Sequence, residues 1–305
     1  MTLIELLESF PTDEACRQHL IKMRWPKGVA CLKCSCDRVS ELKSRKQWTC
    51  LECRYRFSAT AGTIFHKTHI GLRKWFIALF IILNAKKGIS SLEVNRQLGI
   101  SQECCWHMCH RIREAMREDH GQIELFDGVV QIDDYYHGGD PRPEDKGKLK
   151  RGRGSQNKTT IVGAYDSDAG TIRTKHLPNL KQKTVADAVM PWMDAKGTTL
   201  HSDEFLGYDK LGRLCREHRQ VNHDEWYVAK DGTHCNAVEN AWSLFNRAVI
   251  GSFHQISRKH LHRYLSEFDS RFNSRKQGMG KFFDRVLRQS NGRMLPGKTL
   301  TNGII

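Results

Sequence analysis

Three acidic residues that lie far apart in the chain could together hold divalent metal ions. Asp133 stands within a strand-like segment, Asp203 closes a second one, and Glu239 follows 35 residues later in a helix-like segment. Carboxylates are ligands that Mg²⁺ or Mn²⁺ prefers, and two such ions about 4 Å apart stabilise both the attacking and the leaving oxygen of a phosphodiester. The pattern therefore predicts metal-dependent phosphoryl transfer, with these three acids as catalytic residues and magnesium ligands.

Asp134 competes with Asp133 for the role of first ligand, because the side chains of a strand alternate between its two faces. Gln131 shares a face with Asp133, whereas Ile132 shares the opposite face with Asp134. We expect Gln131 and Asp133 to line the wetter face, and we therefore favour Asp133. A carboxylate buried in a sheet is costly without a partner, so we expect a metal ion or another cation beside it.

Four cysteines form two Cys-x-x-Cys pairs, Cys31 with Cys34 and Cys50 with Cys53, separated by 15 residues. This spacing is typical of a zinc ribbon, in which four thiolates surround one Zn²⁺ ion tetrahedrally. Cys36 is an alternative ligand. A site with four protein ligands leaves no position for a substrate, so we predict a structural Zn²⁺ ion and a role in DNA docking.

The pattern of apolar and turn-forming residues divides the chain into five segments. In the fourth segment, three predicted strands precede a helix, a strand, a helix, a strand and a final helix, which is the order of a ribonuclease-H-like α/β domain. The predicted strands are 129–136, 159–165, 171–177, 198–202 and 220–222, and the predicted helices are 184–193, 205–215 and 236–249. The segments are an N-terminal helical segment (1–28), a zinc ribbon (29–66), a helical region (67–120), the α/β domain (125–275) and a C-terminal tail (276–305).

The helical region resembles a helix-turn-helix around Gly99. Apolar residues recur where such a motif buries its elbow, and the second helix would expose His107 and Arg111 toward a DNA groove. A plain helical hairpin is the alternative interpretation. The fold class predicted for the whole chain is thus a ribonuclease-H-like α/β domain preceded by a zinc ribbon and a helix-turn-helix-like helical domain.

The chain is strongly basic, with a formal net charge of +15, which favours a polyanionic partner such as DNA. A basic loop between residues 138 and 158 contains Lys150, Arg151 and Arg153, which could clamp a DNA backbone, although a solvated charge run is the alternative. In the last predicted helix, Asn236 and Arg247 lie near Glu239, and we expect them to contact substrate DNA.

The remaining composition argues against secretion and against a membrane protein. The 11 cysteines do not form a disulfide pattern, the N-terminus lacks a basic and then apolar signal segment, and the longest apolar run, 75–83, is too short to cross a bilayer. We therefore expect a soluble cytoplasmic protein with no membrane partner.

Several segments in their order along the chain resemble the insertion-sequence transposases of the IS1595 group. The segments that carry this resemblance are 50–58 with 62–65, 132–139, 202–203 with 207–208, 236–244, and 267–268 with 271–273. The resemblance covers about residues 25 to 280. It implies an ISXO2-like DDE domain whose catalytic acids are Asp133, Asp203 and Glu239. It further implies that the zinc ribbon and the helices bind terminal inverted repeats, in a prokaryotic cell and near its nucleoid.

Two positions depart from the family pattern. The family commonly has Asp-Glu where this chain has Asp133-Asp134, and it tends to have Lys-Arg where this chain has Asn246-Arg247. The basic role at the second position would then fall to Arg247.

The leading hypothesis is a DNA transposase that cleaves element ends and joins them to target DNA, as at least a dimer on DNA. A structure-specific nuclease of the same fold and a non-catalytic DNA-binding regulator are the alternatives.

Overall fold

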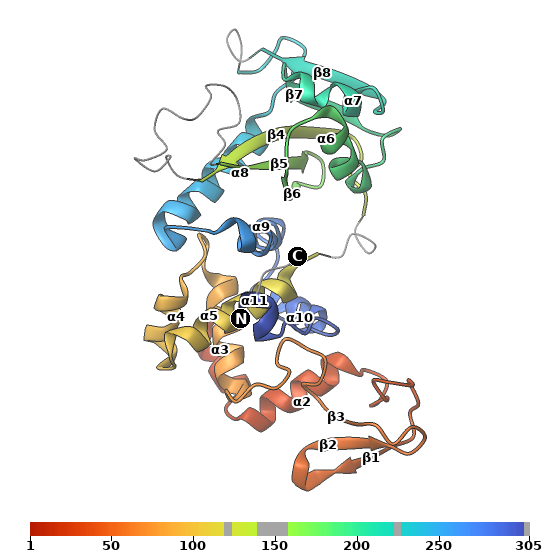
Figure 1. Cartoon of the computed structure of the whole chain (residues 1–305), viewed down its shortest axis with the longest axis vertical. Coiled ribbons are helices and arrows are strands. Elements are labelled where there is room, and N and C mark those ends of the chain that lie inside the picture. Colours follow the sequence, from red (N-terminus) through yellow and green to blue (C-terminus); the bar gives the residue numbers. More distant parts are fainter. Residues whose placement is uncertain (119–123, 139–157, 223–226, 302–305) are drawn as a thin grey trace. The chain divides into compact units, whose positions relative to one another are not determined.

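The computed structural model describes residues 1–118, 124–138, 158–222 and 227–301. The chain forms two compact units (Figure 1). Unit 1 contains Met1–Arg117 together with the chain from Lys276 onward, and unit 2 contains Glu118–Arg275. Among the described residues, no helix has both the length and the apolar character needed to cross a membrane.

Unit 1 contains a small antiparallel sheet next to the cysteine pairs. Its strands pair in the order β1 (Val39–Leu42), β2 (Gln47–Cys50) and β3 (Arg56–Ser58), with the 3₁₀ turn η1 (Lys43–Arg45) between the first two. Trp48 on β2 lies opposite Phe57 on β3, and the two rings are 5.9 Å apart and nearly parallel. This aromatic contact, with a third ring from Trp25, supplies most of the core of a sheet that is too small to bury much else.

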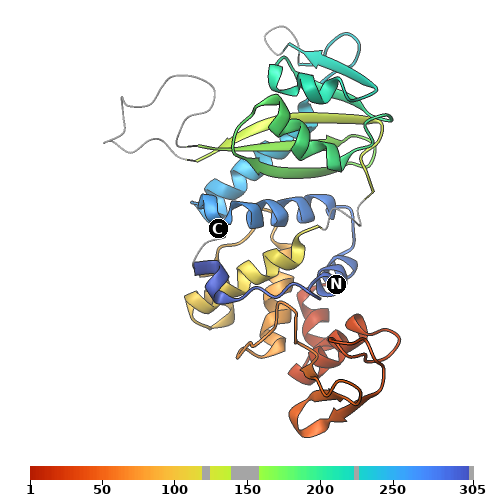
Figure 2. The ribbon, with the colours of Figure 1, turned by 45° about the vertical axis from the view of Figure 1, so that its right-hand side comes forward.

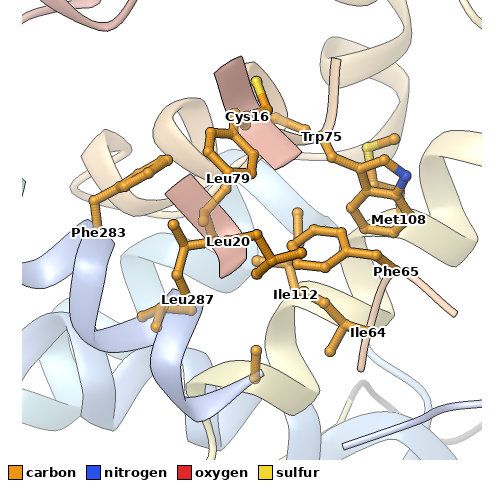
Figure 3. Packing of buried hydrophobic residues seen from close by; sticks show 14 of the residues in the cluster. Cys16, Leu20, Ile64, Phe65, Trp75, Leu79, Met108, Ile112, Phe283 and Leu287 are labelled. Carbon is orange, nitrogen blue, oxygen red and sulfur yellow. The ribbon is translucent and has the colours of Figure 1, made fainter. Parts of the chain in front are cut away.

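The helices of unit 1 surround one hydrophobic core (Figure 3). Cys16, Leu20, Phe65, Leu79 and Met108 from four separate segments meet in it, and each is almost fully buried. The helices are α1 (Leu3–Ser9), α2 (Asp13–Arg24), α3 (Leu72–Asn84), α4 (Ser91–Leu98), α5 (Gln102–Met116), α10 (Met279–Gln289) and α11 (Gly297–Thr301).

The turn between α4 and α5 follows from local sequence signals. The Ser90 hydroxyl accepts the amide of Glu93 at 3.1 Å and caps α4. Gly99 ends the helix with a φ of 61°, which a residue without Cβ adopts at little cost. Helices α4 and α5 pack on one another after this turn.

Helix α10 lies in the segment where the sequence suggested only a C-terminal tail. Phe283 of α10 packs against Phe76 of α3 with ring centres 5.5 Å apart. The Oδ1 atom of Asp284 on α10 lies 3.0 Å from Nε2 of His19 on α2. Residues beyond 276 therefore help to complete the core of unit 1.

Unit 2 is built on a five-stranded sheet in the order β6-β5-β4-β7-β8. The first three strands in sequence pair antiparallel, and β4 pairs parallel with β7, which pairs parallel with β8. This mixed order is that of the ribonuclease-H-like fold predicted from the sequence. The strands are β4 (Val129–His137), β5 (Thr159–Asp166), β6 (Thr171–Leu177), β7 (Thr199–Asp203) and β8 (Glu217–Val221).

Helices cover both faces of this sheet, as Figures 1 and 2 show. One face packs Ile132 and Leu200 under α6 (Gln182–Val189) and α7 (Asp209–Gly212). The other packs Ile161 and Ile172 under α8 (Asn236–Ala248) and α9 (Leu261–Asn273). Because side chains alternate along each strand, successive residues of β4 face different helices. Short helical turns flank these helices: η4 (Met190–Trp192) follows α6, η5 (Leu206–Tyr208) precedes α7, and η6 (Val249–Phe253) and η7 (Arg258–His260) lie between α8 and α9.

Candidate active site and zinc site

Asp133 lies in the middle of β4 and faces helix α8. Its partner across the β4–β5 pair is Gly163, and the indole ring of Trp242 on α8 occupies the space where a side chain at Gly163 would be. Asp134 points to the opposite face, where its Oδ1 accepts a hydrogen bond of 2.9 Å from the buried Tyr208 hydroxyl. The two neighbouring acids therefore have different surroundings, and only Asp133 faces the helix that carries Glu239.

Asp203 ends β7, the parallel neighbour of β4. Gln131 pairs with His201 in this parallel ladder, so Asp133 and Asp203, each two residues further along, lie at the same level and on the same face. The Phe205 amide donates to Asp203 Oδ1 at 3.1 Å, which restrains the carboxylate just after the strand ends. The carboxyl ends of parallel strands are where α/β sheets commonly bind ligands.

Glu239 lies in the first turn of α8. The apolar side of this helix packs on the sheet through Val238, Trp242 and Phe245, whereas Glu239 is only partly buried. Residue Cys235 at the start of α8 gives no side-chain cap. Instead, Gln131 Oε1 on β4 accepts the Ala237 amide at 2.9 Å, which joins the strand of Asp133 to the helix of Glu239.

Asp203 and Glu239 lie close enough to Asp133 to affect the charge of its carboxyl group. Burial, together with the negative charges of Asp134, Asp203 and Glu239, raises the pKa of Asp133 from its ordinary value to about 8. Burial also raises the pKa of the Cys235 thiol, with a contribution from the same three acids, Asp133, Asp203 and Glu239. A cluster of hard oxygen ligands with this excess of negative charge fits divalent cations such as Mg²⁺ or Mn²⁺.

Gln131 is buried, which differs from the wet face expected from the sequence. Only 2 % of its surface is exposed, because the first turn of α8 covers it. Its amide nitrogen donates to the Ser167 hydroxyl at 3.1 Å, so both ends of the side chain are satisfied. Sequence reasoning placed Gln131 on the correct side of β4 but gave no sign of what would cover it.

The residues predicted to contact DNA lie in three different kinds of surroundings. Asn236 and Arg247 are exposed on α8, the helix that also carries Glu239. Lys150, Arg151 and Arg153 fall within residues 139–157 and lie outside the described part of the chain.

In α5, the two residues predicted to face a DNA groove, Arg111 and His107, have different surroundings. Arg111 donates to the backbone carbonyls of Ile64, His66 and Leu295 at 3.1–3.2 Å, so its guanidinium joins segments of unit 1 to one another. His107 is partly buried beside Trp106.

The four predicted zinc ligands meet in unit 1. The ligand atoms of Cys31, Cys34, Cys50 and Cys53 all lie within 4.8 Å of one another. Three of the sulfur pairs are 3.4–3.6 Å apart, and a tetrahedral ion with Zn–S bonds of about 2.3 Å requires pairs about 3.8 Å apart.

Backbone amides favour the thiolate form of Cys31 and Cys50. The Lys33 amide donates to Cys31, and the Cys53 amide donates to Cys50 and lowers the pKa of Cys50 to about 6. Cys36 stands outside the cluster and accepts the Arg38 amide. These residues fit one structural Zn²⁺ ion.

Comparison with known families gives a match in two parts of the chain. Residues 126–273 match the family described as ISXO2-like transposase domain, and residues 11–56 match the family described as transposase zinc-ribbon domain. The chain belongs to the IS1595 group of insertion-sequence transposases. The first match contains the whole β4 to α9 region and with it Asp133, Asp203 and Glu239, while the second contains the four cysteines.

This transposase is also similar to individual proteins. It is 25% identical over 280 residues to an uncharacterised protein in transposable element ISH50 of Halobacterium salinarum, and the alignment covers 87% of this chain and 92% of that protein. A structure of the catalytic core domain of BIV integrase matches with 16% identity and a TM-score of 0.32, over 49% of this chain and 85% of that one. A simian T-cell lymphotropic virus intasome structure matches with 11% identity and a TM-score of 0.30, over 58% and 63%.

Proposed function

We propose that this transposase cleaves DNA at the ends of its insertion sequence and joins the released ends to target DNA. The observation that carries the proposal is the placement of Asp133, Asp203 and Glu239 at the α8 face of the unit 2 sheet, where the charges of Asp203 and Glu239 raise the pKa of Asp133. Divalent ions bound there would lower the pKa of the nucleophile and stabilise the leaving oxygen.

The side chains around the acids support binding and positioning of DNA. Asp133 and Asp203 are held by adjacent strands, and Glu239 is held by a helix that Gln131 ties to β4, so the three carboxylates are preorganised. Asn236 and Arg247 are exposed on the same helix and would contact the phosphates of the element end. The zinc ribbon and the helices of unit 1 would bind the terminal inverted repeats.

The proposed chemistry has two steps that use the same acids. In cleavage, a water oxygen forms a bond to the phosphorus at the element end, and the bond from that phosphorus to the 3′-oxygen breaks, which leaves a 3′-hydroxyl. In joining, this 3′-oxygen forms a bond to a phosphorus of the target, whose own 3′-oxygen leaves and takes up a proton. Transposition needs the two element ends held together, so we expect at least a dimer on DNA.

A strand-transfer assay tests this proposal. Purified protein, a labelled duplex of the element's own end, target DNA and Mg²⁺ should give joined products with the wild type and none with Asp203→Ala. Asp187→Asn is the matched control, because Asp187 is an exposed acid on α6 at the opposite face of the sheet. Cutting without joining would indicate a nuclease, and tight binding without either reaction would leave a DNA-binding regulator. Each of these two results would overturn the proposal.

A further inference from the structure

A polar cavity opens in unit 1 between the zinc-ribbon sheet and the segment that follows it. Its volume is about 300 Å³, at the lower end of the range for small-ligand sites and far too small for a duplex. We call it the ribbon pocket. It is lined by Gln47, Tyr55, Arg56, Phe57, Ser58, Thr60, Ala61, His66, Lys67 and Thr68.

One wall of the ribbon pocket is aromatic. Phe57 is buried beneath Trp48, and the ring of Tyr55 stacks on Phe57 with centres 6.0 Å apart and planes 12° apart. Tyr55 nevertheless keeps 40% of its surface exposed. Because Tyr55 lines the ribbon pocket and keeps this exposure, a flat partner can reach its ring, and the contact with Phe57 helps to hold the ring in place.

The charges that line the ribbon pocket are positive. Arg56 and Lys67 are exposed at its walls, and no carboxylate is among its lining residues. The Gly62 amide donates to His66 Nδ1 at 3.3 Å, which places the proton of a neutral imidazole on Nε2, where it can be donated. Burial, together with the charges of Lys67 and Arg111, lowers the pKa of His66 and keeps it neutral.

An exposed aromatic face, two cations and several hydrogen-bond donors match the chemistry of one nucleotide. A base stacks on an aromatic ring whatever its identity, and a phosphate pairs with Arg or Lys. A paired base cannot reach such a cavity, because it remains stacked in the duplex.

We propose that the ribbon pocket binds one unpaired nucleotide of DNA, with its base on Tyr55 and its phosphate between Arg56 and Lys67. This proposal rests on the DNA-processing function proposed above and adds to it a contact that distinguishes an unpaired or frayed position from an intact duplex. It gives the zinc-ribbon region a specific role at DNA that is partly opened, such as an element end before or after cleavage.

The test compares two duplexes of one sequence, one fully paired and one with a single unpaired 2-aminopurine. The full-length wild type with zinc bound should bind the unpaired duplex more tightly, by about tenfold, because a stacked base contributes on that scale. Its 2-aminopurine fluorescence should be quenched by the stack. Tyr55→Ala should lose both the quench and the preference and should keep its affinity for the paired duplex, whereas Tyr55→Phe should retain both.

Matched controls separate the ribbon pocket from general charge and from catalysis. Arg56→Ala should weaken binding of the unpaired duplex more than Arg45→Ala, which removes a ribbon cation outside the pocket. Asp203→Ala should keep the preference, so failure of strand transfer and failure of this proposal are distinguishable. Zinc content is measured for each variant, and Arg56→Ala carries the test if Tyr55→Ala loses zinc. Equal binding of both duplexes by the wild type, or an unchanged quench in the pocket variants, would overturn the proposal.

Discussion

The indole ring of Trp242 lies against Gly163, the cross-strand partner of Asp133, so closely that a Cβ at residue 163 would be 2.5 Å from Trp242 Cζ2. Trp242 follows Glu239 by three residues on α8, and its ring also stacks on the ring of Tyr135 with centres 5.5 Å apart. The missing side chain at Gly163 thus sets how near the helix of Glu239 comes to the strand of Asp133.

Gly163→Ala should therefore reduce strand transfer without touching an acid. The added methyl must displace the Trp242 ring or shift α8, at a cost of about 1–3 kcal/mol in unfolding free energy for overpacking. We expect a loss of activity of at least tenfold, because misplacement of a catalytic group by about 1 Å has effects of this size. Initial rates at saturating Mg²⁺ and thermal unfolding would be measured together.

Gly251→Ala is the matched control, since nothing lies within 4 Å of a Cβ at that position. A second variant, Trp242→Leu, should recover part of the activity when it is combined with Gly163→Ala. Full activity of Gly163→Ala alone would show that the approach of α8 does not position Glu239.

Gln131 should matter for catalysis although it touches no substrate. Gln131→Leu would leave the Ala237 amide at the start of α8 without its acceptor, which costs about 1 kcal/mol in cases of lost helix caps. Gln131→Glu keeps that acceptor. We expect the leucine variant to have a lower kcat at nearly unchanged KM for DNA, and to need more Mg²⁺ for half-maximal rate.

Gln220→Leu, at an exposed position of β8, controls for the loss of a glutamine from the sheet. If Gln131→Glu and Gln131→Leu were equally impaired in their Mg²⁺ requirement, the hydrogen bond to Ala237 would not be the reason. Ser167→Ala removes only the other bond of the Gln131 amide and should have the smaller effect.

The sequence was informative wherever a residue's role depends on local pattern. The role predicted for Asp133 rests on the alternation of side chains along a strand, and the role predicted for Asp203 rests on its position at the end of a strand. The zinc site rests on the spacing of the cysteine pairs. The burial of Gln131 depends on α8, which begins more than 100 residues later, and no local pattern encodes that contact. The close approach of Trp242 to Gly163 likewise depends on a contact between segments far apart in the sequence.

Other differences arose from signals that were present but weak. The segment after Gly278 carries Phe282, Phe283, Val286 and Leu287 at helical spacing, and all four are buried in unit 1. Arg111 has the type and spacing of a DNA contact, yet three carbonyls from distant segments take up its donors.

Asp133 should make the stability of the magnesium-free protein depend on pH. In the unfolded chain its carboxyl releases a proton near the ordinary pKa of 3.8, whereas in the folded chain it does so at about 8. Between these values the folded state holds a proton that the unfolded state has released, so the free energy of unfolding falls as pH rises through this window. Asp133→Asn does not titrate and should become progressively more stable than the wild type up to about pH 8.

Urea unfolding of both proteins at several pH values, without added Mg²⁺, measures this difference. Asp187→Asn serves as the control and should follow the wild type at every pH. Added Mg²⁺ should raise the wild-type midpoint most at high pH, where the carboxylate is ionised, and should have little effect on Asp133→Asn. If the free energy of unfolding had the same pH dependence in Asp133→Asn and in the wild type, the raised pKa of Asp133 would be contradicted.

Removal of zinc should affect unit 1 and spare the fold of unit 2. The zinc ribbon has a small aromatic core, so much of its folding free energy must come from the bound ion. Cys50→Ser should reduce zinc content from one ion per chain to none and abolish preferential binding of the element end. The sheet of unit 2, with its own two hydrophobic clusters, should still unfold cooperatively.

Cys104→Ser provides the matched control, because Cys104 is an exposed thiol outside the cluster and should leave zinc content unchanged. Metal analysis, limited proteolysis and binding to a labelled element-end duplex report on the three expectations separately. If Cys50→Ser retained both zinc and end binding, the four thiolates would not be the ligands. If it lost zinc but kept end binding, recognition of the element end would depend on parts of the chain other than the zinc ribbon.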